Sequence, residues 1–366
     1  MKILIIGEYS GFIKNLTYGF KNYNDVEVVV FAQADGYKTI KQDVKCYSYA
    51  EYDNFKLFGV QIRKSYLLRG IIPFLKFKRD IKKYKNYFDV VFIVNAEFLR
   101  PNWYLFKPLF SSKDLYYVKK NNAKVFLSAC GFDYANIQYM KYNAPQVAYH
   151  ILNSYDNTFY NLQNKIAYKC SDGIIPVAYL YAQSYRDYKS DIKLLNSIPL
   201  PFNATTIPYQ DNIKNSKIRI FNGVLRQWKG SKFTEEALSI IQEKYGDSVE
   251  IVFYRKPYDE FIKSLSDINI YIDQCGNSYG VAALVAMSAG CVTFSGDSIE
   301  NNHELRVVDS PIIPMSYDVP SIVEKISWWV EHPEEFLKRG AESRAYVERY
   351  HNPDLIAKLY MEIFNS

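Results

Sequence analysis

Short apolar segments alternate with helical segments along the whole chain, and this alternation most strongly limits the possible folds. In the first half, runs rich in apolar residues predict buried strands at Ile3–Ile6, Val26–Ala32, Val90–Val94, Lys124–Ser128, Gly173–Pro176 and Ile198–Pro201. The segments between them predict helices at Ile13–Asn22, Ile151–Cys170 and Ala178–Tyr188. Strands that alternate with helices indicate a parallel sheet wound on both faces.

A second unit of the same kind follows a linker of proline and polar residues at 201–216. Its predicted strands are Lys217–Asn222, Val249–Tyr254, Ile268–Asp273 and Cys291–Ser295. Its predicted helices are Lys232–Tyr245, Tyr258–Ser264, Val281–Ala289, Val319–His332 and Pro333–Tyr350. A chain of 366 residues is long enough for two domains that each bury a core. We therefore expect an α/β protein with two doubly wound domains facing each other across a cleft.

Cysteine usage and hydropathy indicate the compartment. The five cysteines (Cys46, Cys130, Cys170, Cys275 and Cys291) are widely spaced and form no CxxC pair, which favours reduced thiols over a disulfide framework or a zinc site. The first residues, MKILIIGEYSG, predict a strand rather than a signal peptide. No apolar run approaches the roughly 20 residues of a membrane span. We expect a cytoplasmic protein that is soluble or peripheral to the inner membrane face.

Charge is distributed unevenly along the chain. The net charge of +6 divides into +12 over residues 1–205 and −6 over residues 206–366. The segment Arg63–Lys85 holds nine basic residues, and Asp80 is its only acid. Such a segment suits an anionic membrane surface, and it equally suits a solvated helix face. Nucleic acid is not expected as a partner, because no recognition motif accompanies the charge. The 34 Tyr and 23 Phe reflect either coding bias or a surface on which carbohydrate stacks.

The stretch Tyr271–Asp297 predicts a phosphate site. A strand ends near Asp273, a turn follows from Gly276 to Gly280, and a helix of small residues begins at Val281. The first turn of that helix carries no acid, so its free N–H groups and positive dipole end suit a phosphate group.

A second loop is expected at the same sheet edge. Arg226, Lys229 and Gly230 follow the first strand of the second domain. The planar guanidinium group of an arginine and the ammonium group of a lysine both suit a diphosphate. Taken alone, however, this loop is more simply explained by two cations that are solvated. Because ligands bind at the carboxyl ends of parallel strands, the two loops are expected to converge on one spot. Gly7 and Gly11 follow the first strand of the first domain without forming GxGxxG, so no nicotinamide or flavin cofactor is expected.

These residues resemble those of GT-B nucleotide-sugar glycosyltransferases, specifically the retaining family-4 group that includes bacterial surface-polysaccharide enzymes. That group carries a G-R-…-K-G loop, matched by Arg226, Lys229 and Gly230. It also carries G-x-x-G-x-x-x-L-E-A-M-A-x-G-x-P-V, matched at Tyr279-Gly280, Leu284, Ala286-Met287 and Ala289-Gly290. Ser128–Asp133 is similar to the group's first-domain loop, although Cys130 stands where histidine is usual, and Arg344–His351 is similar to its closing segment.

The resemblance implies a domain division and a set of site residues. The domains would be residues 1–205 for the acceptor, 206–345 for the donor, and 346–366 for a helix that crosses back. Arg226 and Lys229 would stabilise charge on the leaving diphosphate, with Asp133 as a third catalytic residue. Donor-binding residues would be Gly223, Asn277, Ser278, Tyr279, Gly280, Val281 and Val285. Residues that position the acceptor or the sugar would be Gly7, Glu8, Gly11, Gly131 and His150.

Two positions depart from the family. Asn277 and Val285 stand where members carry two acids, and valine cannot accept a hydrogen bond from a ribose hydroxyl. Losing that acceptor costs about 1.5–3 kcal/mol, or roughly 10- to 100-fold in donor affinity.

The expected function is transfer of a hexose or related sugar from a nucleoside-diphosphate sugar to a glycan or lipid-linked acceptor, with no metal and no cofactor. One alternative is a non-catalytic binding or scaffold subunit, which Val285 favours and which the retained Arg226 and Lys229 oppose. Another is a sugar-nucleotide epimerase on the same fold. An inverting variant could use Asp133 or Glu8 as general base.

Overall fold

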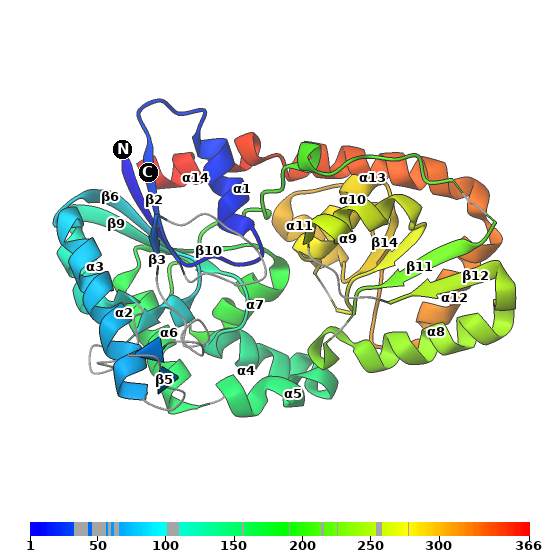
Figure 1. Cartoon of the computed structure of the whole chain (residues 1–366), viewed down its shortest axis with the longest axis horizontal. Coiled ribbons are helices and arrows are strands. Elements are labelled where there is room, and N and C mark those ends of the chain that lie inside the picture. The colour runs from blue at the N-terminus through cyan, green and yellow to red at the C-terminus, as the bar shows by residue number, and fades with distance from the viewer. Residues whose placement is uncertain are drawn as a thin grey trace.

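The computed structural model describes residues 1–32, 43–45, 56–57, 60–61, 66–100, 110–155, 157–189, 191–213, 216–224, 226–253, 258–276 and 278–366. The chain forms two lobes, each built on one parallel sheet (Figure 1). We call the lobe on the six-stranded sheet the first domain and the lobe on the five-stranded sheet the second domain. The exact residues at which one domain passes into the other stay a prediction.

The main sheet of the first domain has the strand order β10-β9-β6-β1-β2-β3, and the strand pairs within this sheet are parallel. These strands are β1 Lys2–Ile6, β2 Glu27–Ala32, β3 Val44–Lys45, β6 Phe88–Ile93, β9 Lys119–Ala129 and β10 Gly173–Pro176. Two small pairs lie outside the sheet, β4 Lys56–Leu57 with β5 Val60–Gln61 and β7 Leu99–Arg100 with β8 Phe110–Ser111. The buried pattern of β1 and β6 explains the parallel pairing, because both sheet faces are covered.

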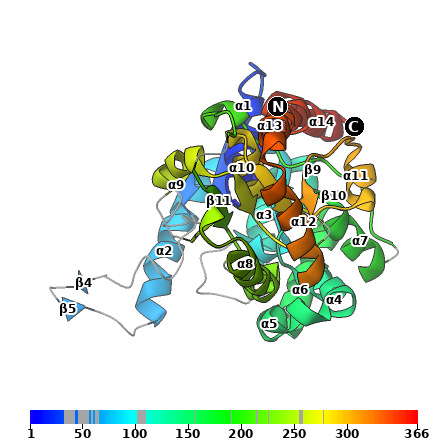
Figure 2. The same ribbon diagram turned by 90° about the vertical axis from the view of Figure 1, so that its right-hand side faces the viewer.

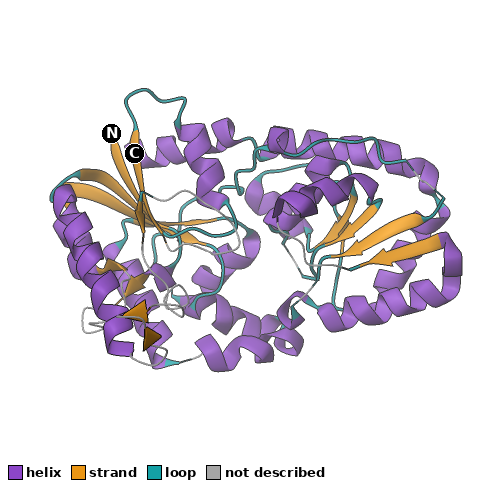
Figure 3. Ribbon diagram, in the orientation of Figure 1, coloured by secondary structure: helices purple, strands orange, loops and turns teal. Residues whose placement is uncertain are grey.

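Helices pack on both faces of this sheet (Figure 3). They are α1 Phe12–Phe20, α2 Tyr66–Ile81, α3 Ser112–Val118, α4 Tyr134–Asn143, α5 Pro145–Tyr155, α6 Thr158–Cys170 and α7 Tyr179–Tyr188. Aromatic rings fill the layers between them. Phe92 of β6 meets Phe12 of α1, and Phe31 of β2 meets Phe77 of α2, both at edge-to-face angles. The aromatic content therefore serves packing in this domain.

The second domain has the strand order β12-β11-β13-β14-β15, again with parallel pairs only. Its strands are β11 Ile218–Asn222, β12 Val249–Val252, β13 Ile270–Ile272, β14 Val292–Ser295 and β15 Ile313–Pro314. Its helices are α8 Ser231–Tyr245, α9 Tyr258–Ser264, α10 Val281–Ala289, α11 Ile299–Leu305, α12 Val319–Glu331 and α13 Phe336–Tyr350. Helices α10 and α13 cover one face, and α8 and α12 cover the other (Figures 1 and 2).

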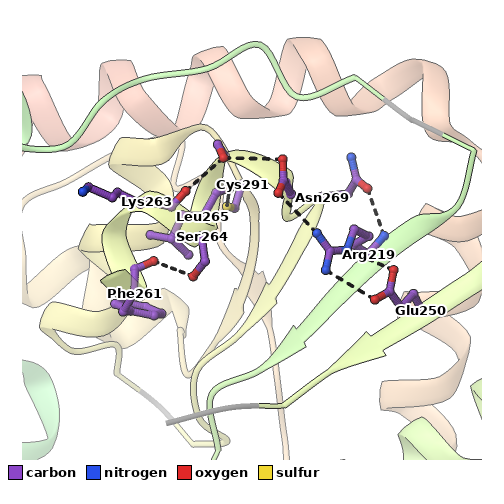
Figure 4. Close-up of polar contacts among 10 residues, drawn as sticks. Arg219, Glu250, Phe261, Lys263, Ser264, Leu265, Asn269 and Cys291 are labelled. Atoms are coloured by element: carbon purple, nitrogen blue, oxygen red, sulfur yellow. Dashed lines mark hydrogen bonds and ion pairs between the residues drawn. The ribbon is translucent and has the colours of Figure 1, made fainter. Parts of the chain in front are cut away.

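Side-chain hydrogen bonds pin the amino ends of these strands (Figure 4). Arg219 of β11 pairs with Glu250 of β12, with Nε 3.0 Å from Oε2. The Asn269 side chain, just before β13, accepts from the Arg219 N–H at 2.9 Å. Near the same edge, Cys291 Sγ donates to the carbonyl of Ile268 at 3.4 Å. At the opposite edge of the sheet, the loops that follow the carboxyl ends of the strands face the first domain.

The last helix, α14 Pro353–Asn365, returns to the first domain and packs against α1. Its residues Tyr360 and Phe364 lie in the core of the first sheet, where the Tyr360 ring contacts Phe92 and the Phe364 ring stacks on Phe126. Gly19 of α1 allows the close approach, since a Cβ there would lie 2.1 Å from the carbonyl oxygen of Pro353.

Two predicted elements differ from the structure. The single helix predicted at Ile151–Cys170 is two helices, α5 and α6, because the Asn157 side chain caps a new helix by accepting from the N–H groups of Phe159 and Tyr160. The strand predicted at Ile198–Pro201 is absent from the described residues. Pro199 and Pro201 have no N–H to donate, so this segment makes only the single ladder-like bond from Ile198 to Pro176.

Candidate donor and acceptor site

A cavity of about 570 Å³ lies between the two domains, at the carboxyl edges of both sheets. Its second-domain wall comes from the ends of four strands and from α10 and α12. The residues on this wall include Trp228, Lys229, Gln274, Ser278, Gly280, Asp297, Tyr317 and Lys325. Its first-domain wall comes from the loops after β1, β9 and β10 and from α4 and α7. That wall includes Tyr9, Gly131, Phe132, Asn136, Tyr139 and Tyr181.

The N-terminus of α10 faces this cavity. Gly280 is the N-cap of this helix and has extended backbone, it supplies no side-chain cap, and the first turn carries no acid. Gly280 and Val281 both line the cavity wall. The nine residues of α10 are nearly all buried, because the closing Gly290 lets α13 approach so tightly that a Cβ on Gly340 would meet the Gly290 carbonyl oxygen at 2.3 Å. The helix is therefore rigidly held with its positive end toward the cavity.

Lys229 brings a cation to the same wall. Its Nζ lies 3.1 Å from Oδ1 of Asp273, whose side chain is 1% exposed. Ser295 Oγ donates to the other carboxylate oxygen at 2.9 Å. The Lys229 carbonyl accepts from the N–H of Cys275, which ties the cation loop to the loop before α10. These bonds hold the 3-10 helix η5, Gln227–Lys229, beside the loop that leads into the N-terminus of α10.

Lys325 is a second cation on the cavity wall that sequence reasoning missed. It lies on α12, and its Nζ donates at 2.6 Å to the carbonyl of Pro314, the last residue of β15. Nothing in the sequence around residue 325 distinguishes this lysine from a solvated helix residue. Only the packing of α12 against α8 turns it toward the cavity edge.

Asp297 is the one carboxylate among the described residues that line this cavity. It follows β14, and burial raises the pKa of its carboxyl. Its oxygens accept from the Ser298 N–H at 3.0 Å and from Asn302 Nδ2 at 3.2 Å. Carboxylate oxygens have further lone pairs, so Asp297 can also accept from a hydroxyl group in the cavity.

An aromatic contact closes the cavity between the domains. The Trp228 ring meets the Phe132 ring edge to face, with centroids 5.9 Å apart. The same two residues pack on an apolar cluster formed by α4 and α5. The guanidinium group of Arg226 also lies near the Trp228 ring, with Cζ 5.2 Å from the ring centroid. Arg226 is exposed and is not among the lining residues.

Tyr279 connects the loop before α10 to the junction of the domains. Its hydroxyl lies 3.2 Å from His351 Nε2 and 3.0 Å from the Tyr346 hydroxyl. His351 Nδ1 lies 2.7 Å from the carbonyl of Leu200, which only accepts, so Nδ1 carries the proton and Nε2 accepts from Tyr279. Burial lowers the pKa of His351 to about 4, which keeps this ring neutral near pH 7.

The cavity gathers only part of the predicted site. Predicted residues that line it are Lys229, Ser278, Tyr279, Gly280, Val281 and Gly131. Those that lie outside the lining are Arg226, Gly223, Val285, Gly7, Glu8, Gly11 and Asp133. Asn277 lies outside the described residues, and so does the side chain of His150, whose backbone lies in α5.

Local structure explains several residues outside the lining. Asp133 is the N-cap of α4 and accepts from the Asn136 N–H and the Tyr185 hydroxyl, both at 2.8 Å. Burial raises the pKa of Asp133 to about 6. Glu8 similarly accepts from the N–H groups of Gly11 and Lys14 at the start of α1. Both carboxylates thus accept hydrogen bonds from backbone N–H groups at the N-terminus of a helix.

Val285 and Gly223 are packing residues. Val285 is 3% exposed and belongs to the apolar cluster between α10 and the sheet. A Cβ on Gly223 would lie 2.7 Å from the Tyr271 hydroxyl, so glycine is needed for β11 and β13 to lie side by side.

Comparison with known proteins identifies the fold. No protein-family model matches the sequence, and no curated protein is similar to it. Among solved structures, the chain is similar to sucrose-phosphate synthase from Thermosynechococcus elongatus, with a TM-score of 0.63, 13% identity and coverage of 100% of this chain and 99% of the other. It is also similar to HepE from Anabaena in complex with UDP and glucose, with a TM-score of 0.61, 11% identity and coverage of 100% and 99%.

A third solved structure is UDP-GlcNAc 2-epimerase from Neisseria meningitidis bound to UDP-GlcNAc, with a TM-score of 0.50, 13% identity and full coverage of both chains. A synthase and an epimerase thus share one architecture, so the similarity identifies the architecture and not the reaction. Two parallel sheets with facing carboxyl edges, matched over the full length of these structures, give this chain the GT-B fold.

Proposed function

We propose that the protein is a glycosyltransferase that moves a sugar from a nucleoside-diphosphate sugar to a glycan or lipid-linked acceptor, with retention. The observation that carries the proposal is the second-domain wall, where Lys229, Lys325 and the N-terminus of α10 line one cavity. Two cations beside the N–H groups of a helix N-terminus suit a diphosphate. Support also comes from HepE and the Neisseria epimerase, structural neighbours whose solved complexes hold UDP and UDP-GlcNAc.

In this proposal the diphosphate lies against Gly280 and Val281, and Lys229 stabilises the charge that develops as it leaves. Asp273 holds Lys229 in place from behind. Asp297 accepts hydrogen bonds from donor hydroxyls, in place of the acids that the family carries at positions 277 and 285. No metal takes part, so transfer is expected to be unchanged in EDTA.

Nucleotide binding is the first test. The first experiment is a thermal-shift panel of UDP, GDP, ADP and their glucose conjugates. The ligands that carry one of the three bases should raise the Tm of the wild type. The double variant Lys229→Ala/Lys325→Ala should lose most of that shift. The matched control is Lys217→Ala/Lys244→Ala, which removes two surface cations paired with Asp247 and Glu331. No shift with any nucleotide, or an unchanged shift in the Lys229/Lys325 variant, contradicts the donor site.

Turnover separates the enzyme from a scaffold subunit. With the nucleotide sugar that binds, proton NMR of the product's anomeric signal should show release of the nucleoside diphosphate and retained configuration. Nucleotide binding without release of nucleoside diphosphate would favour a binding subunit. Epimerised donor in place of transfer product would favour an epimerase.

We further propose that α2 contacts an anionic membrane, in keeping with a cytoplasmic protein at the inner membrane face. None of the helices in the described part of the chain combines the length and hydropathy that crossing a bilayer requires. In the part of the predicted basic segment whose side chains are described, Leu75 is 60% exposed. Exposed basic residues near it are Lys76, Arg79, Lys82, Lys83 and Lys85. Sedimentation with vesicles of phosphatidylglycerol but not of phosphatidylcholine is expected, and equal sedimentation with both would contradict it.

A further inference from the structure

Three loops of the first domain converge on the ring of Tyr9, which lines the cavity. Tyr9 follows β1, and its ring lies against Phe98, which follows β6, with centroids 5.2 Å apart. Gly131, which follows β9, makes room on the other side, since a Cβ there would lie 2.9 Å from Tyr9 Cε2. Gly7 in turn makes room for Phe98, which a Cβ would meet at 2.3 Å. The glycines at these strand ends therefore fix one aromatic side chain.

The Tyr9 hydroxyl donates to Oε1 of Glu97. Glu97 is itself fixed, because its N–H donates to the side chain of Asn95 at 2.8 Å and its carbonyl accepts from Gln163 Nε2 at 3.0 Å. A phenol that donates its proton to a carboxylate has an electron-richer oxygen, which makes that oxygen a stronger hydrogen-bond acceptor. Tyr9 lines the cavity, and its bond to Glu97 fixes the orientation of the phenol oxygen.

Tyr9 lies on the first-domain wall, across the cavity from Lys229 and the N-terminus of α10. Other aromatic residues line the same wall, including Phe132, Tyr139 and Tyr181. Aromatic faces beside a few oriented polar groups suit the apolar faces and hydroxyls of a sugar ring.

We propose that Tyr9 binds the hydroxyl of a sugar acceptor, accepting its hydrogen bond and aiming its oxygen at the donor across the cavity, and that Glu97 is the positioning residue that orients the Tyr9 phenol. This inference rests on the proposed function and names the substrate class of the acceptor half of the same cavity. Tyr9 contributes placement of the attacking oxygen, which raises the transfer rate without any effect on donor affinity.

The chain holds a matched control pair far from the cavity. The Tyr87 hydroxyl lies 2.8 and 2.9 Å from the two carboxylate oxygens of Glu27, and neither residue lines the cavity. Tyr87→Phe and Glu27→Gln therefore remove the same kind of hydrogen bond without touching the proposed acceptor site.

The experiment measures binding of p-nitrophenyl glycosides of glucose, galactose, mannose and N-acetylglucosamine to the UDP-loaded protein by saturation-transfer NMR. The wild type should bind at least one glycoside. Tyr9→Phe should weaken that glycoside's Kd at least tenfold, and Tyr87→Phe and Glu27→Gln should leave it within twofold. The Kd for UDP should stay within twofold in every variant.

Glu97→Gln keeps a partner for the Tyr9 hydroxyl and so tests the pair without leaving a buried acid unpaired. It should weaken glycoside binding less than Tyr9→Phe and remove its pH dependence. Burial raises the pKa of Glu97, although its bond from Tyr9 and the nearby Arg100 act against this, and the Asp133 and Cys130 groups also face it. Glycoside affinity of the wild type should therefore fall as pH drops and Glu97 takes up a proton.

Wild-type glycoside affinity in Tyr9→Phe, or no glycoside bound by the UDP-loaded wild type, would overturn the acceptor inference alone. Failure of the wild type to bind any nucleotide would overturn the proposed function and this inference with it.

Discussion

Lys229 reaches the cavity wall from an ion pair with Asp273, and Asp273 is the more deeply buried partner by a wide margin, with 1% of its side chain exposed against 31% for Lys229. The carboxylate therefore depends on the lysine for compensation of its charge, whereas the lysine still reaches solvent and ligand. The pair serves the fold and the proposed donor site at once.

Lys229→Ala is expected to lower the free energy of unfolding by about 1–3 kcal/mol, because the buried Asp273 loses its cation and keeps the hydrogen bond from Ser295. It should also weaken the Kd for UDP at least tenfold. Lys229→Met/Asp273→Asn should recover most of the stability but none of the affinity. Urea unfolding and calorimetric titration measure the two effects. Recovery of UDP affinity in the double variant would mean that Lys229 acts only on the fold.

Trp228→Ala is expected to loosen the closure of the two domains. Loss of the Phe132 contact should cost about 1 kcal/mol and increase the radius of gyration measured by small-angle X-ray scattering. Trp328→Ala is the matched control, since Trp328 is 45% exposed and stacks on His332 within the second domain. An unchanged radius of gyration in Trp228→Ala would show that other contacts hold the domains together.

His351 predicts a loss of stability in mild acid. Its pKa is about 4 in the folded protein against 6.5 as the ordinary value, so the unfolded chain binds the proton first. The contribution is fully present above pH 6.5 and is lost as pH falls toward 4, by on the order of 3 kcal/mol in total. His351→Gln should flatten urea-unfolding stability between pH 6.5 and 4.5 relative to the wild type. His303 is exposed, so His303→Gln should leave the pH dependence of the unfolding free energy as in the wild type. An equal pH dependence in the two variants would contradict the role given to His351.

Gly131→Ala is expected to displace Tyr9. The backbone of Gly131 has φ of +69°, where alanine costs about 1–2 kcal/mol, and the new methyl group would press on the Tyr9 ring. Glycoside binding should fall as in Tyr9→Phe, while UDP binding stays unchanged. Gly246→Ala is the control, because it also places alanine at a positive φ, of +53°, but with nothing within 4 Å of its Cβ. A similar loss of glycoside binding in both variants would point to general destabilisation.

The architecture was predictable because strand-helix alternation and glycine-closed turns are local signals. The helix Val281–Ala289 has the predicted bounds, and its N-terminus lies at the cavity as the Gly-rich turn indicates. Lys229 was predictable for the same reason, since it follows the first strand of its domain and lies at the same sheet edge.

The full lining of the cavity was not predictable, because no local pattern distinguishes Tyr9 of the first-domain wall, or Trp228 and Lys325 of the second-domain wall, from the many other tyrosines, aromatics and lysines of this chain. Their roles depend on which elements pack together. The site roles expected of Asp133 and Glu8 stay predictions. The structure adds that each carboxylate accepts a backbone hydrogen bond at a helix start, and the position of Asp133 three residues before Asn136 is a pattern that indicates an N-cap.

The return of α14 to the first domain has a consequence for synthesis. The rings of Tyr360 and Phe364 complete a core whose strand β1 leaves the ribosome well before them. Until residues 353–365 emerge, one face of the first sheet stays open to water and to other chains. Co-translational folding should therefore finish in the second domain before it finishes in the first, and a ribosome stalled after α13 should hold a nascent chain that binds chaperones through that uncovered face.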